Sequence, residues 1–197
     1  MTCYLPVGIQ QVLCAELREL LEYQLDESGA APLALTLPFV CPPELHAAYT
    51  RDEILAALGH WTLQRQPAMR EGVLHLPALK ADVFMVTLNK TDKDYSPTTM
   101  YQDYAISETL FHWQSQSTTS EDSPTGMRYR EHQGRGHTIL LCVRENNGGS
   151  GPSQPYYFLG PVDYVKHSGS KPMSITWRMR YPIPAALLRR TAVAAAA

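Results

Sequence analysis

The sequence predicts an α+β protein in which a small helical part precedes a larger, strongly twisted or barrelled β part. Apolar residues recur at three- and four-residue steps between residues 9 and 25, which is the period of a helix. After His75 the pattern changes to short β-rich runs, the period of strands. We therefore expect a helical part over residues 1–75 and a β domain over residues 76–190.

Two helices are expected in the first part. The first runs from Ile9 to Leu25 and ends at Ser28-Gly29. The second begins at Thr50, because Thr50 and Glu53 have the spacing of a capping box, and its buried face comes from Ile54, Leu55 and Leu58. These helices either support the β part or form a linker to another domain, and the pattern leaves both possibilities open.

Four runs read as strands, and the last alternates most clearly between apolar residues and polar or basic ones. Gly160-Pro161 predicts a bulge or corner next to the third run. Asn146 to Ser153 has the composition of a flexible hairpin loop. The runs are Asp82–Leu88, Thr138–Arg144, Pro155–Gly160 and Met173–Arg180.

Composition excludes several classes of protein. With 197 residues, 44% hydrophobic residues and a net charge of -2, the chain has enough apolar material for a core and is not a disordered chain. It has no run of about 18 apolar residues and no secretory signal. The four cysteines form neither a metal pattern nor a convincing disulfide framework. We therefore expect a cytoplasmic protein.

The small net charge conceals an uneven distribution. Residues 1–124 hold 7 Lys and Arg against 16 Asp and Glu, whereas residues 125–197 hold 10 against 3. The two parts therefore carry -9 and +7. A basic surface for a polyanion is one interpretation. Charge alone slightly favours the other, in which the two parts pair within a single fold.

The stretch from Leu88 to Ser117 interleaves aromatic rings with side chains that form paired hydrogen bonds. Such a mixture suits a planar ligand read along its edge, such as a nucleobase, and a carboxylate accepts from the exocyclic amine of cytosine. The alternative is that Tyr101 and Tyr104 fill the core while Asp103 caps a turn, and composition alone favours it. The candidate base-binding residues are Tyr95, Tyr101, Asp103, Tyr104, Trp113, Gln114 and Ser115.

A set of cations forms a second candidate site, for phosphates. The runs around Arg128 and between Lys166 and Lys171 resemble loops that present cations, hydroxyls and backbone N–H groups together. An ordinary solvated surface explains the same residues equally well. The candidate phosphate-binding residues are Lys90, Lys93, Arg128, Arg130, Lys166 and Lys171.

Signals of catalysis are poor. The sequence has no Gly-rich phosphate loop, no His-Glu-x-x-His and no Gly-x-Ser-x-Gly. His132 and His137 flank glycines in an expected loop and have no cysteine nearby, so we interpret them as loop or phosphate-facing residues and not as a zinc site. We expect no enzyme, no catalytic residue, no cofactor and no metal.

Several longer motifs together resemble a known family. They are DVFMVTLNKTDKDYSPTTMYQDYAIS, LFHWQSQSTTS, SPTGMRYREH, ILLCVRE and PYYFLGPVDYVKHSGSKPMSITWRMRYPIP. In this order they resemble the uncharacterised C-terminal domain of bacterial superfamily II helicases, over roughly Leu45 to Leu188. Many of those proteins begin with a phospholipase-D-type nuclease, and some are modification-dependent restriction enzymes. That domain is similar to the SRA (SET- and RING-associated) fold of the PUA-like group, which flips a modified cytosine into a half-barrel pocket.

The resemblance implies a reader domain with a twisted β half-barrel. The sequence contains no helicase motif and no paired His-x-Lys nuclease signature. We therefore expect the specificity module of a modification-dependent restriction system, which binds double-stranded DNA carrying 5-methylcytosine or a relative and works with helicase or nuclease domains. The chemistry of the residues suggests that Tyr101 and Tyr104, or Trp113, sandwich the flipped base. The alternative is an interaction domain that docks a helicase or nuclease without reading a base.

Overall fold

A computed structural model describes residues 12–19, 34–65, 72–88, 103–146 and 153–193, with side chains as far as residue 189. The chain forms two compact units, residues 1–34 and 35–197. In the first unit residues 12–19 are helical, which confirms the centre of the first expected helix, and the rest of that helix lies outside the described residues. None of the described helices has the length and apolar character that a membrane span requires.

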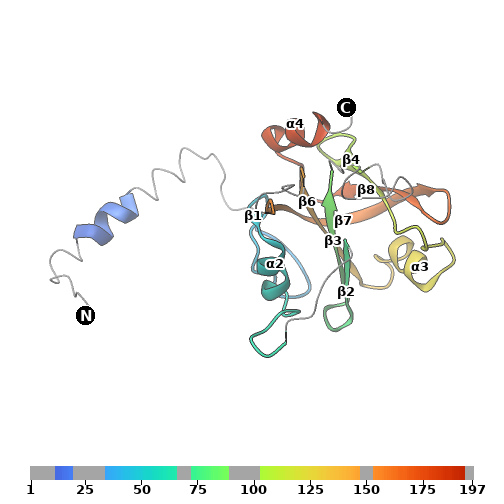
Figure 1. The fold of residues 1–197 in the computed structure, drawn as a ribbon, viewed down its shortest axis with the longest axis horizontal. Coiled ribbons are helices and arrows are strands. Elements are labelled where there is room, and N and C mark those ends of the chain that lie inside the picture. Colours follow the sequence, from blue (N-terminus) through green and yellow to red (C-terminus); the bar gives the residue numbers. More distant parts are fainter. Residues whose placement is uncertain (1–11, 20–33, 66–71, 89–102, 147–152, 194–197) are drawn as a thin grey trace. The chain divides into compact units, whose positions relative to one another are not determined.

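The second unit mixes strands and helices, as the sequence predicted (Figure 1). Its elements, in chain order, are β1 (Ala48–Tyr49), α2 (Arg51–Ala57), β2 (Val73–Leu76), the 3₁₀ turn η1 (Pro77–Leu79), β3 (Ala81–Thr87), β4 (Tyr104–Ala105), β5 (Leu110–Gln114), α3 (Pro124–Arg130), β6 (Thr138–Arg144), β7 (Tyr156–Ser168), β8 (Ser174–Met179) and α4 (Ala185–Val193).

The eight strands found among the described residues belong to one sheet. Its order is β2-β3-β6-β7-β8-β5-β4, and β1 pairs with β7. β3 and β6 are parallel, whereas the other pairs are antiparallel. Within the described part of the chain β2 and β4 end the path without pairing with each other, so the sheet is open. The fold is therefore α+β with a large open sheet.

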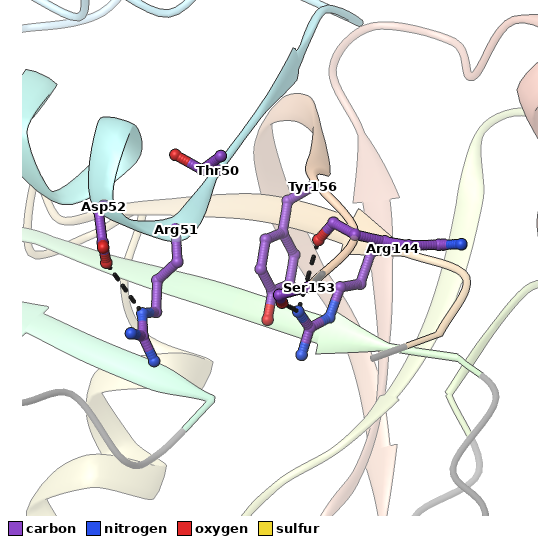
Figure 2. Close-up of a pocket in the computed structure, with 7 residues that line it drawn as sticks. Thr50, Arg51, Asp52, Arg144, Ser153 and Tyr156 are labelled. Carbon is purple, nitrogen blue, oxygen red and sulfur yellow. Dashed lines mark hydrogen bonds and ion pairs between the residues drawn. The ribbon is translucent and has the colours of Figure 1, made fainter. Parts of the chain in front are cut away.

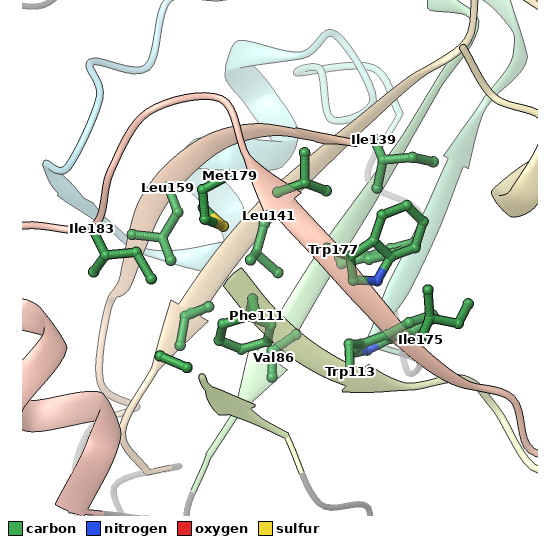
Figure 3. Packing of buried hydrophobic residues seen from close by; sticks show 14 of the residues in the cluster. Val86, Phe111, Trp113, Ile139, Leu141, Leu159, Ile175, Trp177, Met179 and Ile183 are labelled. Atoms are coloured by element: carbon green, nitrogen blue, oxygen red, sulfur yellow. The ribbon is translucent and has the colours of Figure 1, made fainter. Parts of the chain in front are cut away.

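The two parallel strands are buried on both faces. Every residue of β3 and of β6 is buried, and both strands fall in runs that the sequence predicted to be strands. Phe84 and Leu141 face one core cluster, where Trp113 of β5 and Trp177 of β8 also pack (Figure 3). Met85 faces a second cluster on the other side of the sheet. The central strands are thus held rigidly between two cores.

Helix α2 covers the second cluster. The Thr50 hydroxyl accepts a hydrogen bond from the Glu53 amide, and the Glu53 carboxylate accepts one from the Thr50 amide, so the expected capping box is confirmed. Ile54 and Leu55 are fully buried in the cluster with strands β2, β3, β6 and β7. This second helix therefore supports the sheet, which was one of the two possibilities that the sequence left open.

A bulge interrupts the pairing of β6 and β7. Leu141 pairs with Gly160 and Cys142 pairs with Phe158, so β7 has one extra residue at this point. The expected bulge is confirmed, but β7 continues through Gly160-Pro161 as far as Ser168. Gly160 has φ +79, and a Cβ there would lie 2.6 Å from a methyl group of Leu45. The chain therefore needs glycine at this position.

Helix α3 replaces a predicted loop. The run Ser123 to Arg130 was expected to be a cation-presenting loop, and this interpretation is wrong. Ser123 caps a helix by accepting from the Gly126 amide at 3.0 Å, and Pro124 fits its first turn. A Cβ at Gly126 would lie 2.1 Å from the Ser120 carbonyl oxygen, so the helix packs tightly on the turn before it. α2 and α3 lie on opposite sides of β2 and β3 in Figure 1.

Strands β5 and β8 both alternate between an inward and an outward face. On β8 the expected apolar face is confirmed, because Ile175, Trp177 and Met179 are buried while Arg178 is exposed. Strand β5 was not predicted from the sequence, and its residues Phe111 and Trp113 are buried. The next residues along each strand therefore point away from the core.

Candidate functional site

A polar cavity lies beside the start of α2, the end of β6 and the start of β7. Its volume is about 370 Å³, within the range of roughly 300–1,000 Å³ typical of small-ligand pockets. Figure 2 shows its lining side chains, which come from three separate segments of the chain. They are Thr50, Arg51, Asp52, Arg144, Ser153, Gln154 and Tyr156.

Arg144 is a buried cation in the wall of this cavity. It ends the apolar strand β6 opposite Thr87, the last residue of the parallel strand β3. Its Nε donates to the Thr87 hydroxyl at 2.9 Å, and its Nη1 donates to the Ser153 hydroxyl at 2.6 Å. The guanidinium carbon lies 4.4 Å from the ring centre of Tyr156, which makes a cation–π contact. A planar cation is therefore held on an aromatic ring at the cavity wall.

The opposite rim carries charges of both signs. Arg51 donates to the Asp52 carboxylate at 3.2 Å, and both side chains are half exposed. The capping box of Thr50 fixes the backbone from which these two side chains project. The hydrogen bonds from Thr50 hold the pKa of the Glu53 carboxyl below its usual value. The cavity can thus offer a carboxylate acceptor, guanidinium donors and a stacked planar group to one ligand.

This cavity was not predicted from the sequence. Its lining includes none of the predicted base-binding or phosphate-binding residues that the structure describes. One signal was present: Arg144 is a charge at the end of an otherwise apolar strand, next to a predicted loop. The start of α2 lies next to the end of β6 only because of the tertiary fold, so no local sequence pattern could have revealed the cavity.

Three of the predicted base-binding residues have packing roles. Trp113 is buried and stacks on Phe84 with ring centres 4.1 Å apart. Ser115 is fully buried, and its hydroxyl accepts from the Met173 amide. The buried Asp103 carboxylate accepts from the Gln114 amide at 2.8 Å. These contacts give the three side chains structural roles within the domain.

The outer sheet face brings other predicted residues together. Tyr104 stacks on His112 with ring centres 4.8 Å apart, and Gln114 lies two residues further along the same strand. His112 pairs with Thr176 of β8, which in turn pairs with Lys166 of β7. A half-buried aromatic pair and an exposed cation therefore lie on one row across four strands. Tyr95 and Tyr101 lie outside the described residues.

The predicted phosphate-binding residues differ in availability. Lys166 and Lys171 are exposed. Arg128 is bound to the buried Asp82, and Arg130 donates to the Glu121 carbonyl at 3.2 Å. Lys90 and Lys93 lie outside the described residues.

Asp82 is the centre of a buried polar cluster. Its fully buried carboxylate accepts from Arg128 Nε at 2.7 Å, His75 Nδ1 at 2.9 Å and His137 Nε2 at 2.9 Å. The three partners come from α3, β2 and the turn before β6, so one carboxylate ties three segments to β3. Among the described residues, His75, Asp82 and His137 are also the group that could hold a metal ion.

His132 and His137 lie in the turn between α3 and β6, as the sequence predicted, but both are buried, so neither is available to face a phosphate. Two backbone partners fix the tautomer of His132. Its Nδ1 donates to the His137 carbonyl, and its Nε2 accepts from the Tyr164 amide. Burial lowers the pKa of both imidazoles, although the Asp82 charge partly offsets this at His137. Both rings are therefore expected to be neutral near pH 7.

The fold and the site define an α+β domain with one large open sheet and a polar, aromatic-walled cavity where β6 ends and β7 begins. The family model described as a domain of unknown function (DUF3427) matches residues 44–191. The match covers more than half of the chain, so the protein belongs to this family, and the matched region includes α2 as well as the strands. None of the curated proteins compared with the chain matches it.

Proposed function

We propose that this chain is a DNA-binding reader module that recognises a modified cytosine, 5-methylcytosine or a relative, by flipping it out of the duplex. In this proposal the module has an SRA-like half-barrel and gives specificity to a cytoplasmic, modification-dependent restriction system. It works with helicase or nuclease domains in the same chain or in another. It has no catalytic residues of its own.

The cavity is the observation that carries the proposal. A flipped base needs a planar surface for its face and hydrogen-bonding groups for its edge. The Arg144 guanidinium on Tyr156 offers such a surface, since bases stack on guanidinium planes as well as on aromatic rings. Asp52 can accept from the exocyclic amine of cytosine, and Gln154 can read a second edge position. These roles replace those that the sequence suggested for Trp113 and Ser115.

Exposed cations would supply the affinity that does not depend on sequence. Three exposed cations lie close along the chain: Lys166 on β7, Lys171 in the turn after it, and Arg178 on β8. Contacts of this kind with phosphates release counterions and make binding dependent on salt. Unstacking a base costs a few kcal/mol, and stacking of about 1–3 kcal/mol together with the phosphate contacts can offset it.

Gel-shift titrations of matched duplexes, with and without one 5-methylcytosine, test the assignment of the cavity. Asp52→Asn should reduce the ratio of the two affinities, because it removes the carboxylate that reads the base edge. Asp122→Asn is the matched control, since Asp122 is 92% exposed and does not line the cavity. An unchanged ratio in Asp52→Asn would show that the cavity does not read the base.

A second variant separates backbone binding from base reading. Lys171→Ala should weaken binding to both duplexes equally and reduce the slope of log affinity against log salt by about one. A change in the ratio without a change in the salt slope would contradict the role given to Lys171.

The alternative is an interaction domain that docks a partner protein. The exposed apolar side chains of Val12, Leu13 and Leu17 on the helical residues 12–19 favour it. Size-exclusion chromatography with and without duplex DNA distinguishes the two proposals. Co-elution with DNA supports the reader, and separate elution at low salt supports the docking domain.

A further inference from the structure

We propose that His75, Asp82 and His137 form a binding site for a divalent transition-metal ion. The site lies at the start of β3, whereas the Arg144 cavity lies at the end of that strand. It is therefore separate from the proposed base pocket, and it does not depend on whether the chain binds DNA.

The sheet register brings the three side chains together. His75 of β2 is the direct antiparallel partner of Asp82 in β3, and His137 immediately precedes β6, which pairs with β3 on its other side. One ligand atom from each side chain lies within 4.8 Å of the other two. The imidazole rings stack with centres 5.6 Å apart and planes 29° apart, and each ring contacts a different oxygen of the same carboxylate. The site is thus largely formed before an ion binds.

The donor set suits zinc and similar ions. Two imidazole nitrogens and a carboxylate oxygen are common ligands of Zn²⁺, at about 2.0–2.2 Å from the ion. Ligand atoms around a tetrahedral ion at that distance lie roughly 3.3 Å apart. His75 Nδ1 lies 2.9 Å from Asp82 Oδ1 and His137 Nε2 lies 2.9 Å from Asp82 Oδ2, so each imidazole needs only a few tenths of an ångström of adjustment relative to its own carboxylate oxygen.

The imidazoles also have to change their donor roles. A carboxylate accepts hydrogen bonds, so His75 Nδ1 and His137 Nε2 now carry the hydrogens. On binding an ion each ring moves this hydrogen to its other nitrogen, and the freed lone pair faces the metal. The His75 side chain is 39% exposed, which gives an ion a path from solvent to the buried Asp82.

Arg128 is the competitor for this site. Its Nε and Nη2 donate to the two Asp82 oxygens at 2.7 and 3.3 Å, so the guanidinium neutralises the carboxylate when no ion is present. The side chain is 20% exposed and projects from the last turn of α3, so it can leave toward solvent. A bound ion would take over the carboxylate and release Arg128. Removing a histidine should therefore weaken the binding of the ion, whereas removing the arginine should strengthen it.

Calorimetric titration of the full chain with ZnCl₂, after removal of bound metal with EDTA, tests the proposal. We expect one equivalent to bind, His75→Ala to weaken binding at least tenfold and Arg128→Gln to tighten it at least tenfold. His60→Ala is the matched control, because His60 follows α2 and does not belong to the cluster, and it should leave the affinity unchanged.

Three results would overturn the site. Wild type and His75→Ala could bind zinc equally, Arg128→Gln could bind no more tightly than wild type, or wild type could bind no zinc. The circular dichroism spectrum of each variant shows whether it has folded. Because His75 is largely at the surface, its variant remains informative even if substitutions of the buried His137 prevent folding.

Discussion

Replacing Asp82 by asparagine tests the view that one buried charge fastens α3 and β2 to the sheet. The wild-type carboxylate is fully buried and accepts from three side chains, one of which is the guanidinium of Arg128. Asparagine keeps one acceptor oxygen but turns an NH₂ group toward groups that also donate. Arg128 would lose its counter-charge in a site from which water is largely excluded.

The size of the effect follows from this burial. Removing one partner of a buried ion pair costs about 3–5 kcal/mol, because the remaining charge is left uncompensated. For a protein of this size each kcal/mol changes Tm by about 2–4 °C, so the expected decrease is roughly 6–20 °C. Arg128 is partly exposed and can turn toward water, so we expect the lower half of this range.

Urea unfolding followed by tryptophan fluorescence measures the difference, since Trp113 and Trp177 are buried in the core. The assay contains EDTA, so that a bound ion does not contribute. Asp163→Asn is the control: it also breaks an arginine pair, but Arg180 is 42% exposed, and we expect a loss of at most about 1 kcal/mol. Equal losses in the two variants would refute the role of Asp82 as a buried anchor.

Three further predictions concern local structure and pH. Gly126→Ala should destabilise the protein by about 3 kcal/mol through its steric clash, whereas Gly59→Ala, with φ +70 and free space around it, should cost about 1 kcal/mol in urea unfolding. Thr50→Ala should cost about 1 kcal/mol by removing the helix cap, and a Thr50→Ser variant that was equally unstable would contradict this reason. Burial lowers the pKa of His132, so the unfolded chain binds a proton more readily than the folded one, and stability should decrease as the pH falls below 6.5. The urea midpoint of unfolding should therefore decrease when the pH is lowered from about 7 to 5.5. An unchanged midpoint, or an equal decrease in the His132→Gln variant, would contradict the role given to His132.

The fold could be predicted from the sequence where the signals were local. The continuous apolar runs of β3 and β6 and the capping box of α2 were recognised correctly, because one stretch of residues determines each of them. The helix α3 was mistaken for a loop, although Ser123 and Pro124 are typical of a helix start. Its proline, glycine and arginines suggested an exposed loop, and its packing against the turn at Ser120 could not be foreseen.

The candidate site was harder to predict because it is assembled from distant segments. Arg144, Tyr156 and Asp52 meet through the pairing of β6 with β7 and the position of α2. Trp113 was predicted to stack on a base, but its ring packs in the core. The alternation of buried and half-buried residues along β5 would have indicated this. Aromatic and polar residues that are close in sequence alternate between the two faces of a strand, so their proximity alone did not make a pocket.

The central claim is that the module distinguishes a modified cytosine from an unmodified one. Fluorescence anisotropy at a single salt concentration measures its affinity for two labelled duplexes that differ only in one 5-methyl group. The proposal predicts binding to the modified duplex that is tighter by about tenfold or more, within the range that one base position contributes in specific complexes. Equal affinities for the two duplexes would contradict it.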